Sequence, residues 1–183
     1  MKLLAPLSAL AAALLIGACS DKPSPDEDGV IRRQGQADVI QDFDAARMEA
    51  AISEAKSNLS QFIGALSDPQ PGQKDFAIKH GFKVPGSGRE YLWITEPTFG
   101  SDGFTGLVNN DPIHLEDLSM GQEVTIPRDE VADWLYDDNG QLQGGYTIAA
   151  LVYGSPEQDA YADAMGIDWN AYEFLELETE SAQ

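Results

Sequence analysis

The stretch EYLWIT, residues 90–95, decides the fold, because it is the strongest strand pattern in the chain. Its odd-numbered positions, which include Tyr91 and Trp93, fall on one face of an extended segment. Its even-numbered positions, which include Leu92 and Ile94, fall on the other face. Two apolar faces predict a central strand that is covered on both sides.

A helix precedes this strand. Apolar residues recur at spacings of four and three and form one stripe along a helix: Met48, Ile52, Ala55, Leu59, Phe62 and Leu66. Asp42 or Asp44 can cap the start of the helix, and Pro69 ends it. The stripe predicts packing against a sheet. A partner-binding or coiled-coil helix is the alternative.

Further strand patterns surround this central strand. Alternation of apolar and polar residues predicts strands at residues 76–82, 104–108, 113–118, 123–126 and 142–152. Turns rich in Gly, Asn, Asp and Pro separate them. We therefore expect five or six strands.

Two more helices are expected in the second half of the chain. Pro127 begins a short one, which carries Val131, Trp134 and Leu135 at helical spacing. Ser155 caps a final one, and the side chains that dock it are Met165, Trp169, Tyr172 and Phe174. Helices and strands do not alternate regularly. The fold class is therefore α+β, an antiparallel sheet with an N-terminal amphipathic helix and a C-terminal helix.

The N-terminus has the pattern of a lipoprotein export signal. Lys2 precedes a run of mostly Leu and Ala over residues 3–16, which is too short to span a membrane. Ile16-Gly17-Ala18-Cys19 resembles the lipobox of bacterial lipoproteins, in which the Cys thiol accepts diacylglycerol. We expect residues 1–18 to be removed and Cys19 to carry acyl chains such as palmitate. An ordinary signal peptide with an incidental Cys is the alternative.

The rest of the chain divides into three parts. Residues 19–41 are polar and predict an acylated Cys followed by a flexible tether. Residues 42–175 form a single domain, and residues 176–183 an acidic tail. Because Cys19 is the only Cys, no intramolecular disulfide can form.

The charge balance is strongly acidic, with 31 Asp and Glu against 11 Lys and Arg and a net charge of −20. Such a surface repels nucleic acid, so nucleic-acid partners are excluded. It also repels anionic lipids, so membrane contact is expected through the lipid anchor. Ser20 follows the Cys and Asp21 comes one place later, which favours the outer membrane over the inner one, facing the periplasm.

Seven motifs follow one another in the expected domain: EAAISEA at 49–55, FAIK at 76–79, EYLWI at 90–94, GLVNNDP at 106–112, GQEVTIP at 121–127, DW at 133–134 and GGYT at 144–147. In this order and spacing they resemble the bacterial family known as domain of unknown function 2314. The resemblance implies a small domain of mixed helices and strands. It implies no reaction, substrate or catalytic residue.

Catalytic and metal-binding patterns are weak. His80 and His114 have no partner at i+3 or i+4, so we predict no metal site and no cofactor. The sequence contains no Gly-x-Ser-x-Gly elbow and no phosphate loop. The segments GSG (86–88) and DDNG (137–140) are better explained as turns than as ligand loops. We therefore predict no catalytic residue.

Four strand aromatics are the candidate ligand groove: Tyr91, Trp93, Trp134 and Tyr146. Such residues usually fill a core, but in a groove they would suit a peptide or another apolar-faced ligand. The first hypothesis is a lipid-anchored envelope protein with a non-enzymatic binding or scaffolding domain for a protein or peptide partner. The alternatives are a periplasmic hydrolase and an immunity-type protein that binds a basic partner.

Overall fold

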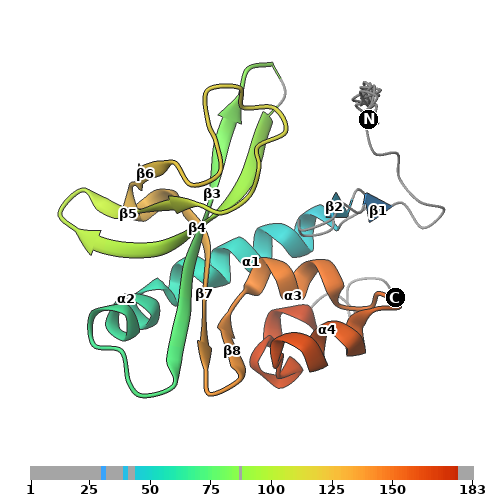
Figure 1. The fold of residues 1–183 in the computed structure, drawn as a ribbon. Helices are drawn as coiled ribbons and strands as arrows, with labels where there is room; N and C mark the ends of the chain where they lie inside the picture. The colour runs from blue at the N-terminus through green and yellow to red at the C-terminus, as the bar shows by residue number, and fades with distance from the viewer. Residues whose placement is uncertain (1–29, 32–38, 41–43, 87, 177–183) are drawn as a thin grey trace, which may run out of the picture.

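The computed structural model describes residues 30–31, 39–40, 44–86 and 88–176. The fold is α+β, as predicted, and in the described part of the chain six antiparallel strands form one sheet in the order β6-β5-β4-β3-β7-β8 (Figure 1). The strands of the sheet are β3 (Gln73–Val84), β4 (Gly88–Gly100), β5 (Gly103–Val108), β6 (Glu123–Ile126), β7 (Val131–Asp138) and β8 (Gln141–Gly144). The helices are α1 (Ala45–Ser57), α2 (Leu59–Ser67), α3 (Tyr146–Val152) and α4 (Gln158–Met165).

The predicted N-terminal helix is present, but it is broken in two. Asp44 caps α1, since its carboxylate accepts hydrogen bonds from the backbone N–H groups of Ala46 and Arg47. The break falls at Asn58, whose side-chain amide donates to the Glu54 carbonyl oxygen at 3.0 Å. The same carbonyl oxygen also accepts the Asn58 backbone N–H at 3.1 Å, and Asn58 leaves the helical backbone conformation with a φ of −99° and a ψ of 4°, so α1 ends there and α2 begins at the next residue.

The core lies between the helices and one face of the sheet. Phe62 of α2 is fully buried, and its ring lies 5.6 Å from that of Trp134 and 5.9 Å from that of Phe104. The Trp134 indole N–H donates to the Ala55 carbonyl oxygen at 2.8 Å. This bond ties β7 to α1 and satisfies the polar atom of a fully buried indole.

The strand over residues 90–95 is central, as predicted, because β4 lies between β3 and β5. Its two faces differ, however. Leu92 and Ile94 are buried, whereas Tyr91 is 44% exposed. The prediction of two covered faces is therefore wrong for this half of β4, because the face of Leu92 and Ile94 packs into the core whereas the face of Tyr91 is open.

The hairpin end of β3 and β4 stands clear of the helices (Figure 1). A register shift between Thr95 and Thr98, with Glu96 at a φ of 51°, interrupts the pairing of β4 with β5. The predicted strand at residues 113–118 is wrong, since this segment lies in the loop between β5 and β6. The Glu90 carboxylate accepts the backbone N–H groups of Ile113 and His114 and holds the loop against β4.

The helix predicted after Pro127 is wrong. A single 3-10 turn, Arg128–Glu130, leads into strand β7. Val131 and Trp134 fall at helical spacing only because almost every position of β7 is buried. Pairing with β3 supplies the partners of its backbone, and this non-local pairing outweighs the local spacing.

The long strand predicted at residues 142–152 is also wrong. β8 ends at Gly144, and α3 begins at Tyr146. Gly144 and Gly145 have φ values of 75° and 65°, which turn the chain from strand to helix. The side chain that caps α3 is Asp133, thirteen residues upstream of Tyr146, so no local signal marks the start of this helix.

The C-terminal helix is present as α4, but Ser155 does not cap it. The residue before α4 is Glu157, and the buried Ser155 hydroxyl has no hydrogen-bond partner among the described residues. After α4, the side chains of Tyr172, Phe174 and Leu175 are buried in the core. Leu175 therefore belongs to the folded domain.

The N-terminal region is described only in part. Within the predicted tether, β1 (Val30–Ile31) and β2 (Val39–Ile40) pair antiparallel. The export signal and Cys19 lie outside the described residues.

Candidate functional site

Five exposed or partly exposed side chains lie on the open face of the β3–β4 hairpin. The register pairs Lys83 with Arg89, Gly81 with Tyr91, and Lys79 with Trp93. Directly opposed residues project to the same face of a sheet. We call Lys79, Lys83, Arg89, Tyr91 and Trp93 the outer strip. It brings three cationic and two aromatic side chains together on two strands.

Gly81 is the floor of this strip. A Cβ atom at Gly81 would lie 2.8 Å from the Tyr91 ring and 3.1 Å from the Arg89 side chain. The Arg89 guanidinium donates a hydrogen bond to the Gly81 carbonyl oxygen. The absence of a side chain therefore allows Tyr91 and Arg89 to lie flat on the strand, which holds both groups in one geometry.

Lys79 joins the strip to the protein interior. Its Nζ lies 5.3 Å from the centroid of the Trp93 ring, a cation–π distance. The same Nζ donates to the Thr147 hydroxyl oxygen at 3.0 Å. The Thr147 hydroxyl in turn donates to Asp133 at 2.6 Å. The partly exposed Trp93 is thereby connected to a buried carboxylate.

Asp133 is fully buried on β7. Besides the Thr147 hydroxyl, its carboxylate accepts the backbone N–H groups of Trp134 at 2.8 Å, Tyr146 at 3.2 Å and Thr147 at 2.8 Å. The last two are first-turn donors of α3, so the carboxylate occupies the positive end of that helix.

Burial sets the ionisation of this pair. It raises the pKa of the Asp133 carboxyl, and the Thr147 hydrogen bonds and the Lys79 charge oppose that rise. It lowers the pKa of the Lys79 ammonium, and the Asp133 charge opposes that fall. Each charge therefore depends on the other for its stability in the interior.

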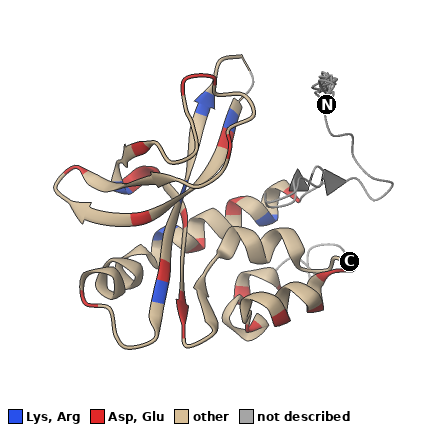
Figure 2. Cartoon of the chain, viewed as in Figure 1, with Lys and Arg blue, Asp and Glu red and all other residues tan. Residues whose placement is uncertain are grey.

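Basic residues are concentrated in these two strands, although the chain has a net charge of −20. The described segments contain seven of them, and four are on β3 or β4: Lys74, Lys79, Lys83 and Arg89. Figure 2 shows acidic positions over most elements of the fold, and β3 and β4 themselves carry Asp75, Glu90 and Glu96, none of which belongs to the outer strip. The outer strip is therefore a local cationic surface on an acidic protein.

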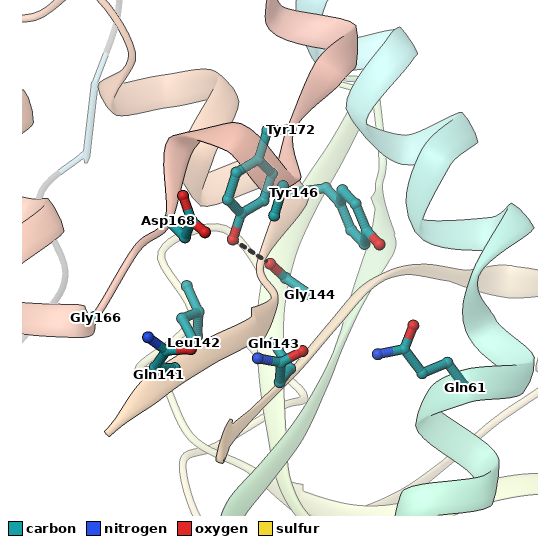
Figure 3. Close-up of a pocket in the computed structure, with 10 residues that line it drawn as sticks. Gln61, Gln141, Leu142, Gln143, Gly144, Tyr146, Gly166, Asp168 and Tyr172 are labelled. Atoms are coloured by element: carbon teal, nitrogen blue, oxygen red, sulfur yellow. Dashed lines mark hydrogen bonds between the residues drawn. The ribbon is translucent and has the colours of Figure 1, made fainter. Parts of the chain in front are cut away.

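The structure does not bring the four predicted groove residues together. Tyr91 and Trp93 lie on the outer strip. Trp134 is fully buried, and Tyr146 is buried with an edge-to-face contact to Trp134 at 5.6 Å. Tyr146 borders a separate pocket beside β8 (Figure 3).

The histidines lie apart from any cluster of ligands. The His80 ring nitrogen Nδ1 hydrogen-bonds the Glu130 carbonyl oxygen at 2.9 Å, and Nε2 lies 3.6 Å from the Glu130 carboxylate. His114 is exposed in the loop before β6. Across residues 44–86 and 88–176, no three His, Cys, Asp or Glu side chains gather in a way that would hold a metal ion. In the same segments, no helix has the length and apolar character needed to cross a membrane.

The predicted turns are present. β3 ends at Val84, a turn follows at residues 85–86 and β4 begins at Gly88, with residue 87 outside the described part of the chain; β7 and β8 are joined at Asn139 and Gly140. In the second turn the Asp137 carboxylate accepts the Gly140 backbone N–H at 3.0 Å, and Asn139 has a φ of 55°. These Asx-type contacts account for the DDNG sequence without a ligand.

Sequence reasoning missed the cationic half of the outer strip. Lys79 and Lys83 occupy odd positions of β3, and Arg89 occupies an odd position of β4, with Tyr91 and Trp93. The two-residue spacing could have indicated a shared face within each strand. Whether the odd positions of β3 and those of β4 lie on the same face depends on the hairpin register. The sequence does not show this register directly.

Comparisons with known proteins find relatives of this chain. The profile of a bacterial family described as "Uncharacterized protein conserved in bacteria (DUF2314)" matches residues 45–169. The chain is similar to the uncharacterized protein YegJ of Escherichia coli (strain K12), with 30% identity over 119 residues, 64% of this chain and 75% of that protein. No solved structure matches the chain.

A second relative is longer. The chain is 33% identical over 82 residues to the putative ankyrin repeat protein NMB1133/NMB1171 of Neisseria meningitidis serogroup B. The match covers 44% of this chain and 32% of that protein, so the chain spans about a third of that relative. With the family profile matching more than half of its length, the chain belongs to the DUF2314 family of uncharacterised proteins conserved in bacteria.

Proposed function

We propose that this protein is a lipid-anchored module of the bacterial cell envelope that binds a partner protein through the outer strip. The observation that carries the proposal is the exposure of Tyr91 beside Arg89 and Trp93 on one sheet face. Tyr, Trp and Arg are the residues that most often dominate the binding energy of protein interfaces. The function is non-enzymatic binding.

The charge of the strip selects the chemistry of the partner. Lys83 and Arg89 are exposed and directly opposed, and no carboxylate shares their face at the hairpin end of the two strands. A guanidinium binds carboxylates in a bidentate manner and stacks on aromatic rings. The partner is therefore a protein with an acidic surface that also offers apolar contacts to Tyr91 and Trp93.

The anchor is a separate part of the proposal. The lipobox sequence that ends at Cys19 supports acylation of this residue, and the polar residues 20–41 support a tether that holds the domain off the membrane. Replacement of Cys19 by Ser is expected to abolish labelling by a radioactive fatty acid and to release soluble protein. Labelling that survives the substitution refutes the anchor.

Two alternatives remain from the sequence. A hydrolase needs a nucleophile and a base at an accessible pocket, and the lining of the pocket beside β8 offers the Asp168 carboxylate but no Ser, Thr, Cys or His. An immunity-type protein with a basic partner would use the acidic remainder of the surface. Binding of the basic partner would then weaken when acidic side chains are reversed in charge. Charge reversal of the residues of the outer strip would not weaken it.

Photo-crosslinking in cells tests the site. Benzoylphenylalanine replaces Tyr91 in one variant and Phe99 in the control, because Phe99 is an equally exposed aromatic away from the strip, at 41% against 44%. We expect a discrete crosslinked protein from position 91 and none from position 99. The same crosslinks from both positions, or none from position 91 under several growth conditions, contradict the proposal.

A further inference from the structure

A pocket of about 220 Å³ lies beside the edge strand β8 (Figure 3). Its lining residues come from α2, β8, α3 and the segment after α4: Gln61, Gln141, Leu142, Gln143, Gly144, Tyr146, Gly166, Asp168, Ala171 and Tyr172. It lies outside the outer strip. None of its ten lining residues is Lys, Arg or His.

Three of these residues are glutamines. Their side-chain amides differ from those of the other described glutamines in their hydrogen bonding. In the described segments, Gln70, Gln73, Gln122 and Gln158 each form a side-chain hydrogen bond with another residue. Gln61, Gln141 and Gln143 form none with the described residues. Three side-chain amides that the protein leaves unpaired therefore converge on one hollow.

The other polar groups of the pocket are held in place. The Tyr172 hydroxyl donates to the Gly144 carbonyl oxygen at 2.7 Å, which leaves its oxygen able to accept a bond. Asp168 uses one carboxylate oxygen for the Asn170 backbone and side-chain N–H groups. Leu142 supplies an apolar wall, so the lining presents donors, acceptors and one apolar contact.

The floor of the pocket is rigid. The Leu142 backbone N–H donates to the Gly166 carbonyl oxygen at 3.0 Å, which fastens β8 to the end of α4. A Cβ atom at Gly166 would lie 2.0 Å from the Gly140 carbonyl oxygen. Such close backbone contact fixes the positions from which Gln141 and Gln143 project, as a binding site requires.

We propose that this pocket binds one ring of a neutral saccharide. Each glutamine amide offers two donors and one acceptor oxygen, which matches hydroxyl groups that donate and accept at once. A pocket without a cation does not compensate the charge of an anionic ligand. Its volume, below that of pockets for drug-sized ligands, limits the occupant to about one ring.

Ligand-observed saturation-transfer NMR with the full chain tests the proposal. The probes are glucose and N-acetylglucosamine at about 10 mM, suited to a Kd near the millimolar range, with glucuronate as the anionic comparison. We expect saturation transfer to at least one neutral sugar and little to glucuronate. No transfer to either neutral sugar, or equal transfer to glucuronate, overturns the proposal.

Variants locate the site. Gln141→Ala and Gln143→Ala are each expected to weaken neutral-sugar binding about three- to tenfold, since each removes hydrogen bonds to the ligand. Gln70→Ala, which alters a paired glutamine outside the pocket, is the matched control and leaves binding unchanged. Equal binding by the pocket variants and the control overturns the assignment. Circular dichroism checks that the four proteins share one fold.

Discussion

The Asp133 carboxylate is a buried charge that caps α3 and stabilises the Lys79 ammonium. The substitution Asp133→Ala removes it. The substitution leaves three backbone N–H groups, those of Trp134, Tyr146 and Thr147, without their acceptor in a buried region. Each unsatisfied donor costs about 1–3 kcal/mol before relaxation and water entry reduce the sum. Lys79 also loses the charge that stabilises it. We expect a loss of about 3–5 kcal/mol in the free energy of unfolding.

Urea denaturation at pH 7, followed by the fluorescence of the three tryptophans, measures this loss. The control is Asp163→Ala, which removes an exposed carboxylate of α4 and should change the free energy of unfolding by less than about 0.5 kcal/mol. A loss below about 1 kcal/mol for Asp133→Ala, or losses equal to the control, would refute the capping role of this carboxylate.

Three further predictions concern the same region. Gly144→Ala places a Cβ atom 2.2 Å from the Trp134 carbonyl oxygen and should destabilise the fold by more than about 2 kcal/mol, whereas Gly86→Ala, at the same φ of 75° in open space, should cost only about 1 kcal/mol; equal melting temperatures of the two variants contradict this. Trp134→Phe loses the indole bond to the Ala55 carbonyl and leaves a cavity, so calorimetry should show a loss of about 2–4 kcal/mol. Burial lowers the pKa of Lys79, so between that pKa and 10.5 the unfolded chain binds more protons than the folded protein. The free energy of unfolding of the wild type should therefore rise with pH relative to that of Lys79→Met, by at most about 1.4 kcal/mol per pH unit. The same difference between the two proteins in urea denaturation at pH 7 and at pH 10 argues against it.

Local signals predicted several elements that precede Pro127. The Asp44 cap, the stripe at helical spacing and the alternation at residues 123–126 all lie within single elements, and the last of these matches the observed bounds of β6. Such patterns report directly on the face that a segment buries. They do not report the Asn58 break, because it depends on one side chain that bonds back to the helix.

The errors share a physical cause. β7 and α3 are determined by partners that are distant in the sequence, namely the pairing of β7 with β3 and the cap that Asp133 provides. A fully buried strand has apolar residues at both periods, so spacing cannot separate it from a helix. The two glycines before Tyr146 indicated a special backbone, but not whether it was a bulge or a helix start.

The candidate sites were predictable to different degrees. Tyr91 and Trp93 are recognisable as strand aromatics, but their exposure depends on which face the helices cover. Arg89 shares their strand and their face, whereas Lys79 and Lys83 of β3 join them only through the hairpin register. The pocket beside β8 assembles residues from the two ends of the domain, so no sequence pattern indicates it.

Lys79 gives the outer strip a connection to the fold. It contacts the Trp93 ring on one side and the Thr147 hydroxyl on the other. A partner that binds Trp93 therefore contacts a residue whose position depends on the buried Asp133. Loss of Asp133 should weaken partner binding in addition to stability, even under conditions where the variant remains folded.

Binding of an acidic partner protein by the outer strip is tested most directly with two charge-reversal variants. The measurement is the affinity of each variant for the partner identified by crosslinking. Arg89→Glu alters the strip, whereas Arg128→Glu alters an exposed arginine elsewhere, and both change the net charge equally. We expect at least about a tenfold increase in Kd for Arg89→Glu, typical of a lost interface arginine, and little change for Arg128→Glu. Equal affinities for the two variants would contradict it.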